Sequence, residues 1–134
     1  MNPVPQCILI VDDDASIRQL LVTFLRRRGF QLLEAHDGRD ALVKMRTGRA
    51  DLVVMDLAMP EVSGWDVLEE RMLDPALVQT PMIVITANNV REVTAMMVGK
   101  HVDAVISKPF DLATLLQAVT VCLHTPDLST PIAA

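Results

Sequence analysis

The fold is decided by the segment CILIVDDD (residues 7–14), in which five apolar residues run directly into three aspartates. A second segment, DLVVMD at residues 51–56, repeats this arrangement. Short continuous apolar runs that are rich in Val and Ile are typical of β-strands buried on both faces of a sheet. We therefore predict two buried strands that each end in acidic residues.

Outward from these two segments, the chain alternates between strand-like and helix-like patterns. Further apolar runs predict strands at residues 30–35, 81–86 and 102–106. Apolar residues recur at helical spacing in five segments: residues 17–25, 41–45 (capped by Asp37), 65–72, 90–97 and 112–123 (capped by Asp111). Strands that alternate with helices pair in parallel through right-handed crossovers. We expect an α/β fold, a flavodoxin-like, doubly wound five-stranded parallel sheet of order 2-1-3-4-5 with five helices.

The length of the chain, 134 residues, predicts one domain with its own core. With 51% hydrophobic and 22% charged residues, the composition is that of a globular protein rather than a disordered one. We assign residues 1–6 to a leader, residues 7–124 to the domain and residues 125–134, which contain Pro126 and Pro131, to a flexible tail.

The net charge of −5 argues against binding to nucleic acid or to an anionic membrane, because both need a basic surface. The two cysteines, Cys7 and Cys122, form neither a disulfide framework nor a zinc motif. The first residues do not resemble a signal peptide, and the apolar runs are too short to cross a bilayer. These features predict a cytoplasmic protein.

Polar side chains stand where the predicted strands end. The first strand ends in Asp12 and Asp13, the third in Asp56, the fourth in Thr86 and the fifth before Lys108. Ligands of open parallel sheets bind beyond the carboxyl ends of the strands, where the strand order reverses. Because strands 1 and 3 are neighbours in the predicted order, the three aspartates are expected to converge. Asp14, in contrast, is interpreted as the cap of the first helix.

Three adjacent carboxylates repel one another and stay ionised together only when a cation joins them. Hard oxygen ligands favour Mg²⁺, which commonly keeps several waters and binds a phosphate of the ligand. The ammonium of Lys108 suits a phosphate oxygen, and the hydroxyl of Thr86 adds a donor. Together these residues predict a phosphoryl-transfer site with a carboxylate nucleophile.

Four motifs in this order resemble the receiver domains of two-component response regulators. They are ILIVDDD at residues 8–14, MDLAMP at 55–60 followed by Gly64, ITA at 85–87, and SKPF at 107–110. The resemblance spans approximately residues 7–123. It implies that Asp56 is phosphorylated by a histidine kinase or a phosphotransfer protein in a phosphorelay, and that the chain then acts on an unknown downstream protein.

The resemblance also assigns roles to the other residues. It implies that Asp13 binds Mg²⁺ directly, that Asp12 acts mainly through water, and that Asp56 and the carbonyl of Ala58 complete the metal ligands. Lys108 and Thr86 would act with Asp56 in catalysis. Both would bind the phosphoryl oxygens, helped by the amide of Ala87. Pro109 would follow a cis peptide bond.

The chain departs from the family pattern at two positions. Val105 stands where the family has Tyr or Phe, and His101 stands where it has Gly. These departures leave a second hypothesis open, a receiver-like interaction module that works without phosphorylation. A third hypothesis, a carboxylate-nucleophile phosphatase, ranks last because the chain has no room for a cap domain. The leading interpretation is a protein that catalyses only its own phosphorylation and dephosphorylation, as a monomer or a phosphorylation-dependent dimer.

Overall fold

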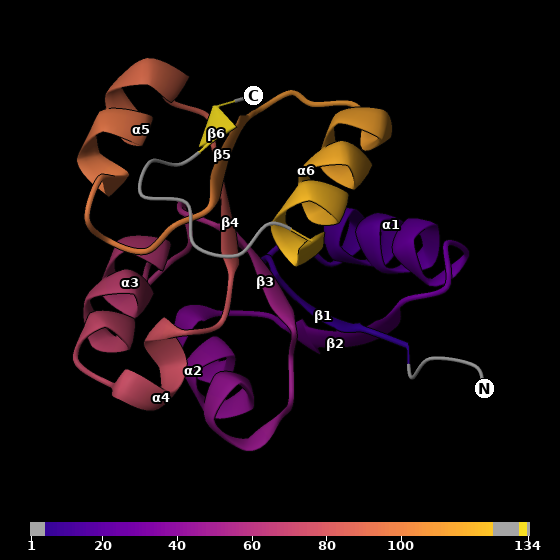
Figure 1. Cartoon of the computed structure of the whole chain (residues 1–134), viewed down its shortest axis with the longest axis horizontal. Coiled ribbons are helices and arrows are strands. Elements are labelled where there is room, and N and C mark those ends of the chain that lie inside the picture. Colours follow the sequence, from indigo (N-terminus) through magenta and orange to yellow (C-terminus); the bar gives the residue numbers. More distant parts are fainter. Residues whose placement is uncertain (1–4, 125–131, 134) are drawn as a thin grey trace.

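The computed structural model describes residues 5–124 and 132–133, which form one parallel sheet covered by helices on both faces (Figure 1). The strands are β1 (Cys7–Val11), β2 (Gln31–Ala35), β3 (Leu52–Asp56), β4 (Met82–Thr86), β5 (Ala104–Ser107) and β6 (Ile132–Ala133). Their order is β2-β1-β3-β4-β5-β6, and every neighbouring pair is parallel. The predicted order 2-1-3-4-5 is confirmed, and the structure adds one strand beyond it.

The added strand comes from the segment predicted as a flexible tail. Ile132 pairs with Ala104, and Ala133 pairs with Val105. The rest of that tail, residues 125–131 and 134, lies outside the described residues, as do residues 1–4 of the predicted leader. A strand of two residues has no apolar periodicity of its own. It forms where β5 presents backbone N–H and C=O groups at the edge of the sheet.

The helices lie in two layers. They are α1 (Ala15–Arg26), α2 (Gly38–Thr47), α3 (Gly64–Met72), α4 (Pro75–Val78), α5 (Val90–Met97) and α6 (Leu112–His124). The buried residues of α1 and α6 pack on one face of the sheet, and those of α2, α3, α4 and α5 pack on the other. None of these helices, within the described part of the chain, has the length and apolar character needed to span a bilayer.

The structure has one helix more than predicted. The single turn α4 begins after Asp74, whose carboxylate accepts a hydrogen bond from the backbone N–H of Ala76, and Pro75 stands at the start of the turn. An aspartate cap followed by proline is a recognised start signal. The turn is too short to show an amphipathic period, which is why the pattern of apolar residues did not predict it.

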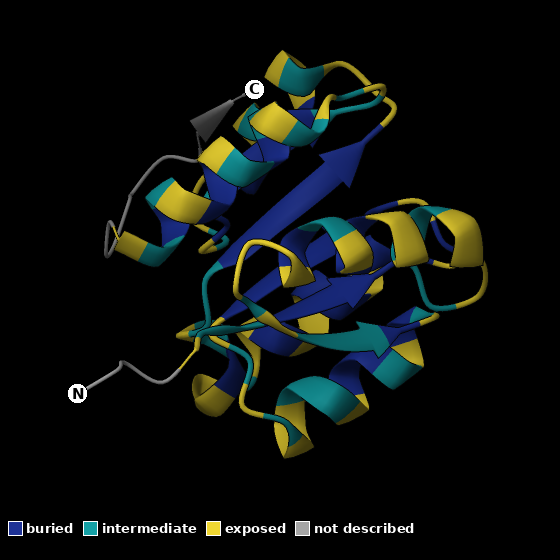
Figure 2. Cartoon of the chain, turned by 90° about the vertical axis from the view of Figure 1, so that its right-hand side faces the viewer, coloured by how far each residue is buried: buried dark blue, intermediate teal, exposed yellow. Residues whose placement is uncertain are grey.

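The central strands form the core of the molecule (Figure 2). All five residues of β3 and all five of β4 are buried. In β1, Leu9 and Val11 face the α2–α3–α5 side of the sheet, whereas Ile8 and Ile10 face α1 and α6. Each such side chain stabilises the fold by about 1.5–3 kcal/mol relative to exposure. Burial on both faces explains why these strands read as continuous apolar runs.

Arg71 is a buried cation that no sequence pattern singles out. Its side chain is 1% exposed, and its guanidinium donates to the carbonyls of Lys100, Val78, Thr80 and His101 at 3.2, 3.1, 2.6 and 2.9 Å. Burial lowers the pKa of Arg71 to about 10, against an opposing effect of Asp103, so the side chain stays charged at neutral pH. It thus joins the end of α3 to the turns before β4 and β5.

His101, in the turn before β5, adopts a left-handed backbone conformation with φ of 56°. This conformation costs an L-residue about 1–2 kcal/mol relative to the right-handed region, whereas glycine adopts it freely. The family pattern has glycine at this position, so the structure gives the physical reason for that preference. The chain retains the turn because Arg71 binds the carbonyl of His101 and holds it in place.

We predict that His101→Gly raises the free energy of unfolding by about 0.5–1 kcal/mol, because it relieves the left-handed strain. His101→Ala is the matched control, since it removes the imidazole but keeps the strained backbone, and it is expected to give no gain. Urea denaturation measures both. Equal stabilisation by the two substitutions would show that the side chain, and not the backbone conformation, is responsible.

We also predict that Arg71→Met lowers the free energy of unfolding by about 1–3 kcal/mol, because it leaves buried carbonyls without their donor. Arg46→Met serves as the control. Arg46 is exposed and lies 3.7 Å from its acidic partners Glu70 and Asp74, so its loss is expected to change stability by less than about 0.5 kcal/mol. Similar losses for the two variants would contradict this account of Arg71.

Candidate functional site

The acidic residues gather at the carboxyl ends of β1 and β3. The register of these strands pairs Val11 with Met55, so that Asp12 and Asp56, the next residues of each chain segment, lie side by side. One carboxylate oxygen each from Asp12, Asp13 and Asp56 lies within 4.8 Å of the others. Asp12 and Asp56 are buried, whereas Asp13 is exposed to solvent. The expected convergence of the three aspartates is therefore present.

Both carboxylate oxygens of Asp56 are held by hydrogen bonds. Oδ2 accepts from Nζ of Lys108 at 2.6 Å, and Oδ1 accepts from the backbone N–H of Ala58 at 3.0 Å. The side chain of Asp56 is only 4% exposed. A carboxylate this buried is stable in its charged form only with such partners. The two bonds also fix the direction in which Asp56 presents its oxygens.

Asp12 is held in a similar way from its own loop. Its Oδ1 accepts from the backbone N–H of Asp14 at 2.9 Å, and its carbonyl accepts from Nη1 of Arg18 at 2.7 Å. Burial raises the pKa of Asp12, and the negative charge of Asp56 raises it further. Asp12 is thus an ionisable group whose charged form this environment disfavours, and a cation in the cluster would relieve that cost.

Lys108 reaches the cluster from the loop that follows β5. Its backbone N–H donates to the carbonyl of Thr86 at 2.7 Å, and the peptide bond to Pro109 is cis, as the family resemblance implied. Burial lowers the pKa of Lys108, but the hydrogen bond and charge of Asp56 outweigh it, so the pKa is raised. The ammonium is therefore protonated and directed at Asp56.

Thr86 is buried at the end of β4, and its Oγ1 accepts from the backbone N–H of Asn88 at 2.9 Å. The hydroxyl hydrogen remains available for donation to a ligand. Ala87 follows in an exposed turn. The ends of β1, β3 and β4 and the loop after β5 thus supply every residue that the sequence predicted for the site.

Two residues around the site were missed or undervalued by sequence reasoning. Arg18 supports the Asp12 loop, and nothing in the pattern of α1 distinguishes it from a surface arginine. Gly64, which follows the second family motif, begins α3 directly behind the site. A Cβ at Gly64 would lie 2.8 Å from the carbonyl oxygen of Asp56 and 2.6 Å from Cα of Leu57, so a larger residue would displace the Asp56 backbone.

The donor set suits a hard divalent cation. Three carboxylates within 4.8 Å offer only oxygen ligands, and the exposed Asp13 leaves one side open to water. Such a set is typical of Mg²⁺ sites that keep part of their hydration shell. The ammonium of Lys108, 2.6 Å from Asp56, adds a positive charge beside this oxygen-rich cluster.

Comparison with known proteins identifies the family of the chain. Residues 8–120 match the family model of the response regulator receiver domain. The chain is 39% identical over 109 residues to the chemotaxis protein CheY-3 of Vibrio cholerae, covering 81% of this chain and 84% of that protein. It is 34% identical over 127 residues to the DNA-binding response regulator MtrA of Mycobacterium tuberculosis, covering 95% of this chain.

The chain spans only about half, 54%, of the length of MtrA. Among solved structures, the chemotaxis response regulator CheY4 of Vibrio cholerae is similar with a TM-score of 0.82 at 28% identity, covering 90% of this chain and all of that one. The receiver domain of the Francisella response regulator 1452 also gives a TM-score of 0.82, at 27% identity. The match to the family model covers most of the chain and includes all four strand ends that build the site. On this basis the chain belongs to the response regulator receiver domain family.

Proposed function

We propose that this protein is a Mg²⁺-dependent phosphoacceptor switch of a two-component phosphorelay, in which Asp56 receives a phosphoryl group from a histidine kinase or a phosphotransfer protein. The observation that carries the proposal is the contact of 2.6 Å between Nζ of Lys108 and Oδ2 of Asp56, beside two further carboxylates. A buried nucleophile, a fixed ammonium and an acidic cluster are the components that phosphoryl transfer requires.

In the proposed reaction, a carboxylate oxygen of Asp56 attacks phosphorus in line as the bond to the donor imidazole nitrogen breaks. Lys108 moves from the carboxylate to a phosphoryl oxygen, with its proton in place because its pKa is raised. The hydroxyl of Thr86 and the N–H of Ala87 donate to the other oxygens. These groups neutralise the charge that is spread over the transferring phosphoryl group.

Asp12, Asp13, Asp56 and the carbonyl of Ala58 would hold Mg²⁺. The exposed Asp13 would bind directly, and the buried Asp12, which is tied to the N–H of Asp14, would act mainly through water. When bound, the metal supplies charge neutralisation at a phosphoryl oxygen. Water then hydrolyses the acyl phosphate, so the protein catalyses only its own phosphorylation and dephosphorylation.

The free cysteines Cys7 and Cys122 are consistent with a reducing, cytoplasmic setting.

One observation favours the second hypothesis, an interaction module that works without phosphorylation. Val105, at the position where the family has an aromatic residue, is 0% exposed and packs within the apolar cluster beneath α5. A buried valine has no ring to turn between inner and outer positions. Signal output through a rotating aromatic side chain is therefore unavailable at this position.

We predict that incubation with acetyl phosphate and Mg²⁺ adds one phosphoryl mass to the protein, and that Asp56→Asn or removal of Mg²⁺ by a chelator abolishes the gain. Intact-protein mass spectrometry measures both. Asp111→Asn is the matched control, because asparagine caps α6 as well as aspartate does and Asp111 is not one of the three clustered carboxylates. No gain for the unaltered protein would favour the interaction module.

We also predict that Asp12→Asn raises the free energy of unfolding in the absence of metal, by on the order of 1 kcal/mol, because it removes a disfavoured buried charge. Since the pKa of Asp12 is raised in the folded state, its ionised form destabilises the fold at neutral pH. This penalty disappears as pH falls through the raised pKa. The advantage of the variant is therefore expected to shrink in acid.

Urea denaturation at neutral and acidic pH, with and without Mg²⁺, tests this expectation. Mg²⁺ should stabilise the unaltered protein more than Asp12→Asn, because a ligand stabilises the state that binds it. Asp14→Asn is the control, since an asparagine caps α1 equally well and the exposed Asp14 is not one of the three clustered carboxylates. Destabilisation by Asp12→Asn at neutral pH without metal would contradict the charge-repulsion account.

A further inference from the structure

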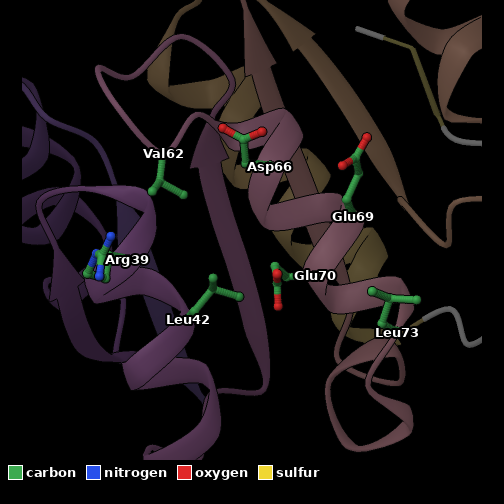
Figure 3. A pocket seen from close by; sticks show the side chains of 7 residues that line it. All are labelled: Arg39, Leu42, Val62, Asp66, Glu69, Glu70 and Leu73. Carbon is green, nitrogen blue, oxygen red and sulfur yellow. The ribbon is translucent and has the colours of Figure 1, made fainter.

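A groove separate from the phosphoacceptor site lies between α2 and α3 (Figure 3). It has a volume of about 440 Å³. Its lining comprises Arg39, Leu42, Val62, Asp66, Glu69, Glu70 and Leu73. Figure 3 shows Leu42 of α2 and Glu70 of α3 facing each other across the groove, with Val62 above them in the loop that leads to α3. Apolar and acidic groups thus meet in one depression.

Of the apolar residues that line the groove, Leu42 is 9% exposed and Val62 is half-buried, so the exposed apolar surface comes from Leu73 and its neighbour. Leu73, at the end of α3, is 81% exposed, and its neighbour Met72 is 39% exposed. A second hollow, lined in part by Met72 and Lys100, adjoins the groove because Glu69 and Leu73 line both. Exposed apolar residues at the edge of a depression, here Leu73 and Met72, are typical of an interaction site.

The charged part of the groove is predominantly negative. Asp66, Glu69 and Glu70 contribute three carboxylates, against the single guanidinium of Arg39. Arg46 lies at one end, but its nitrogens are 3.7 Å from the nearest oxygens of Glu70 and Asp74, so it compensates them weakly. A ligand that complements this lining needs positive charge beside an apolar stripe.

We propose that the groove binds an amphipathic helix of a partner protein, with Lys or Arg residues flanking the apolar stripe. Two adjacent helices present a furrow into which a third helix packs, and apolar residues at helical spacing then fill the depression. The basic residues of such a helix would pair with Glu69, Glu70 and Asp66. This inference is independent of the phosphorylation chemistry of Asp56.

A second copy of the chain fits the groove less well than a basic helix. In a two-fold symmetric dimer the same surface meets itself, so that Asp66, Glu69 and Glu70 would approach their own counterparts. The chain as a whole also carries a net charge of −5. Like charges brought together at an interface oppose association.

The groove borders the loop that follows the phosphoacceptor. Gly38, at the start of α2, lies so close to Val62 that a Cβ would collide with the Val62 carbonyl, and Gly64 is in equally close contact with the backbone of Asp56 and Leu57. The loop is thus wedged between two helix starts. A helix bound against Val62 would lie next to the segment that carries Asp56.

We would test the proposal on the full, ¹⁵N-labelled chain with a synthetic helical peptide that has a leucine stripe flanked by arginines. Saturable binding is expected, with NMR shift changes centred on Leu42, Val62, Glu69 and Leu73. A peptide with glutamates in place of the arginines is expected not to bind. Glu69→Lys and Leu73→Ser change exposed side chains and should each weaken binding about tenfold or more.

Two control variants carry the same chemical changes elsewhere. Glu92→Lys alters an exposed acid on α5, and Leu20→Ser removes a leucine on α1 that is 55% exposed. Each is expected to leave binding within about twofold. Equal weakening by Glu92→Lys would indicate attraction to net charge alone and overturn the proposal, as would the absence of saturable binding. A dimer in sedimentation that Leu73→Ser dissociates would assign the groove to a second copy and also overturn it.

Discussion

The ion pair between Lys108 and Asp56 is the interaction on which the rest of the site depends. Asp56 is buried beside Asp12, and the repulsion between two buried negative charges is costly unless a nearby cation offsets it. The ammonium 2.6 Å from Asp56 supplies that charge from a loop 52 residues away in sequence. Burial, charge and position at the end of β3 together distinguish Asp56 from the other acidic residues.

A cation stands at each end of the sheet, the half-buried Lys108 at one and the buried Arg71 at the other, and they meet different partners. At the carboxyl ends, Lys108 faces carboxylates, and one of them, Asp56, is the proposed phosphoacceptor. At the amino ends of β4 and β5, the guanidinium of Arg71 donates to backbone carbonyls, among them those of Thr80 and His101. Backbone carbonyls do not titrate and bind metals weakly, so the contacts of Arg71 serve the fold. The carboxylates near Lys108 can bind a proton or a metal, so that end of the sheet is suited to chemistry.

The loop between β3 and α3 connects the acidic site to the groove between α2 and α3. Gly64 allows α3 to begin against the backbone of Asp56, and Gly38 allows α2 to begin against Val62. Close packing of this kind transmits small displacements because there is no space to absorb them. A change at Asp56 and a partner bound in the groove would therefore act on the same short segment.

The sequence by itself determined the five main strands, five of the helices and the residues at the carboxyl ends of the strands. Apolar periodicity and helix caps are local signals, and parallel topology brings Asp12, Asp13, Asp56, Thr86 and Lys108 to one edge of the sheet. Only the tertiary structure decided the burial of Arg71, the contact of Gly64 with Asp56, the pairing of β6 with β5 and the groove between α2 and α3. These features arise from how helices, strands and loops pack against one another in space, and no local pattern of apolar residues encodes that packing.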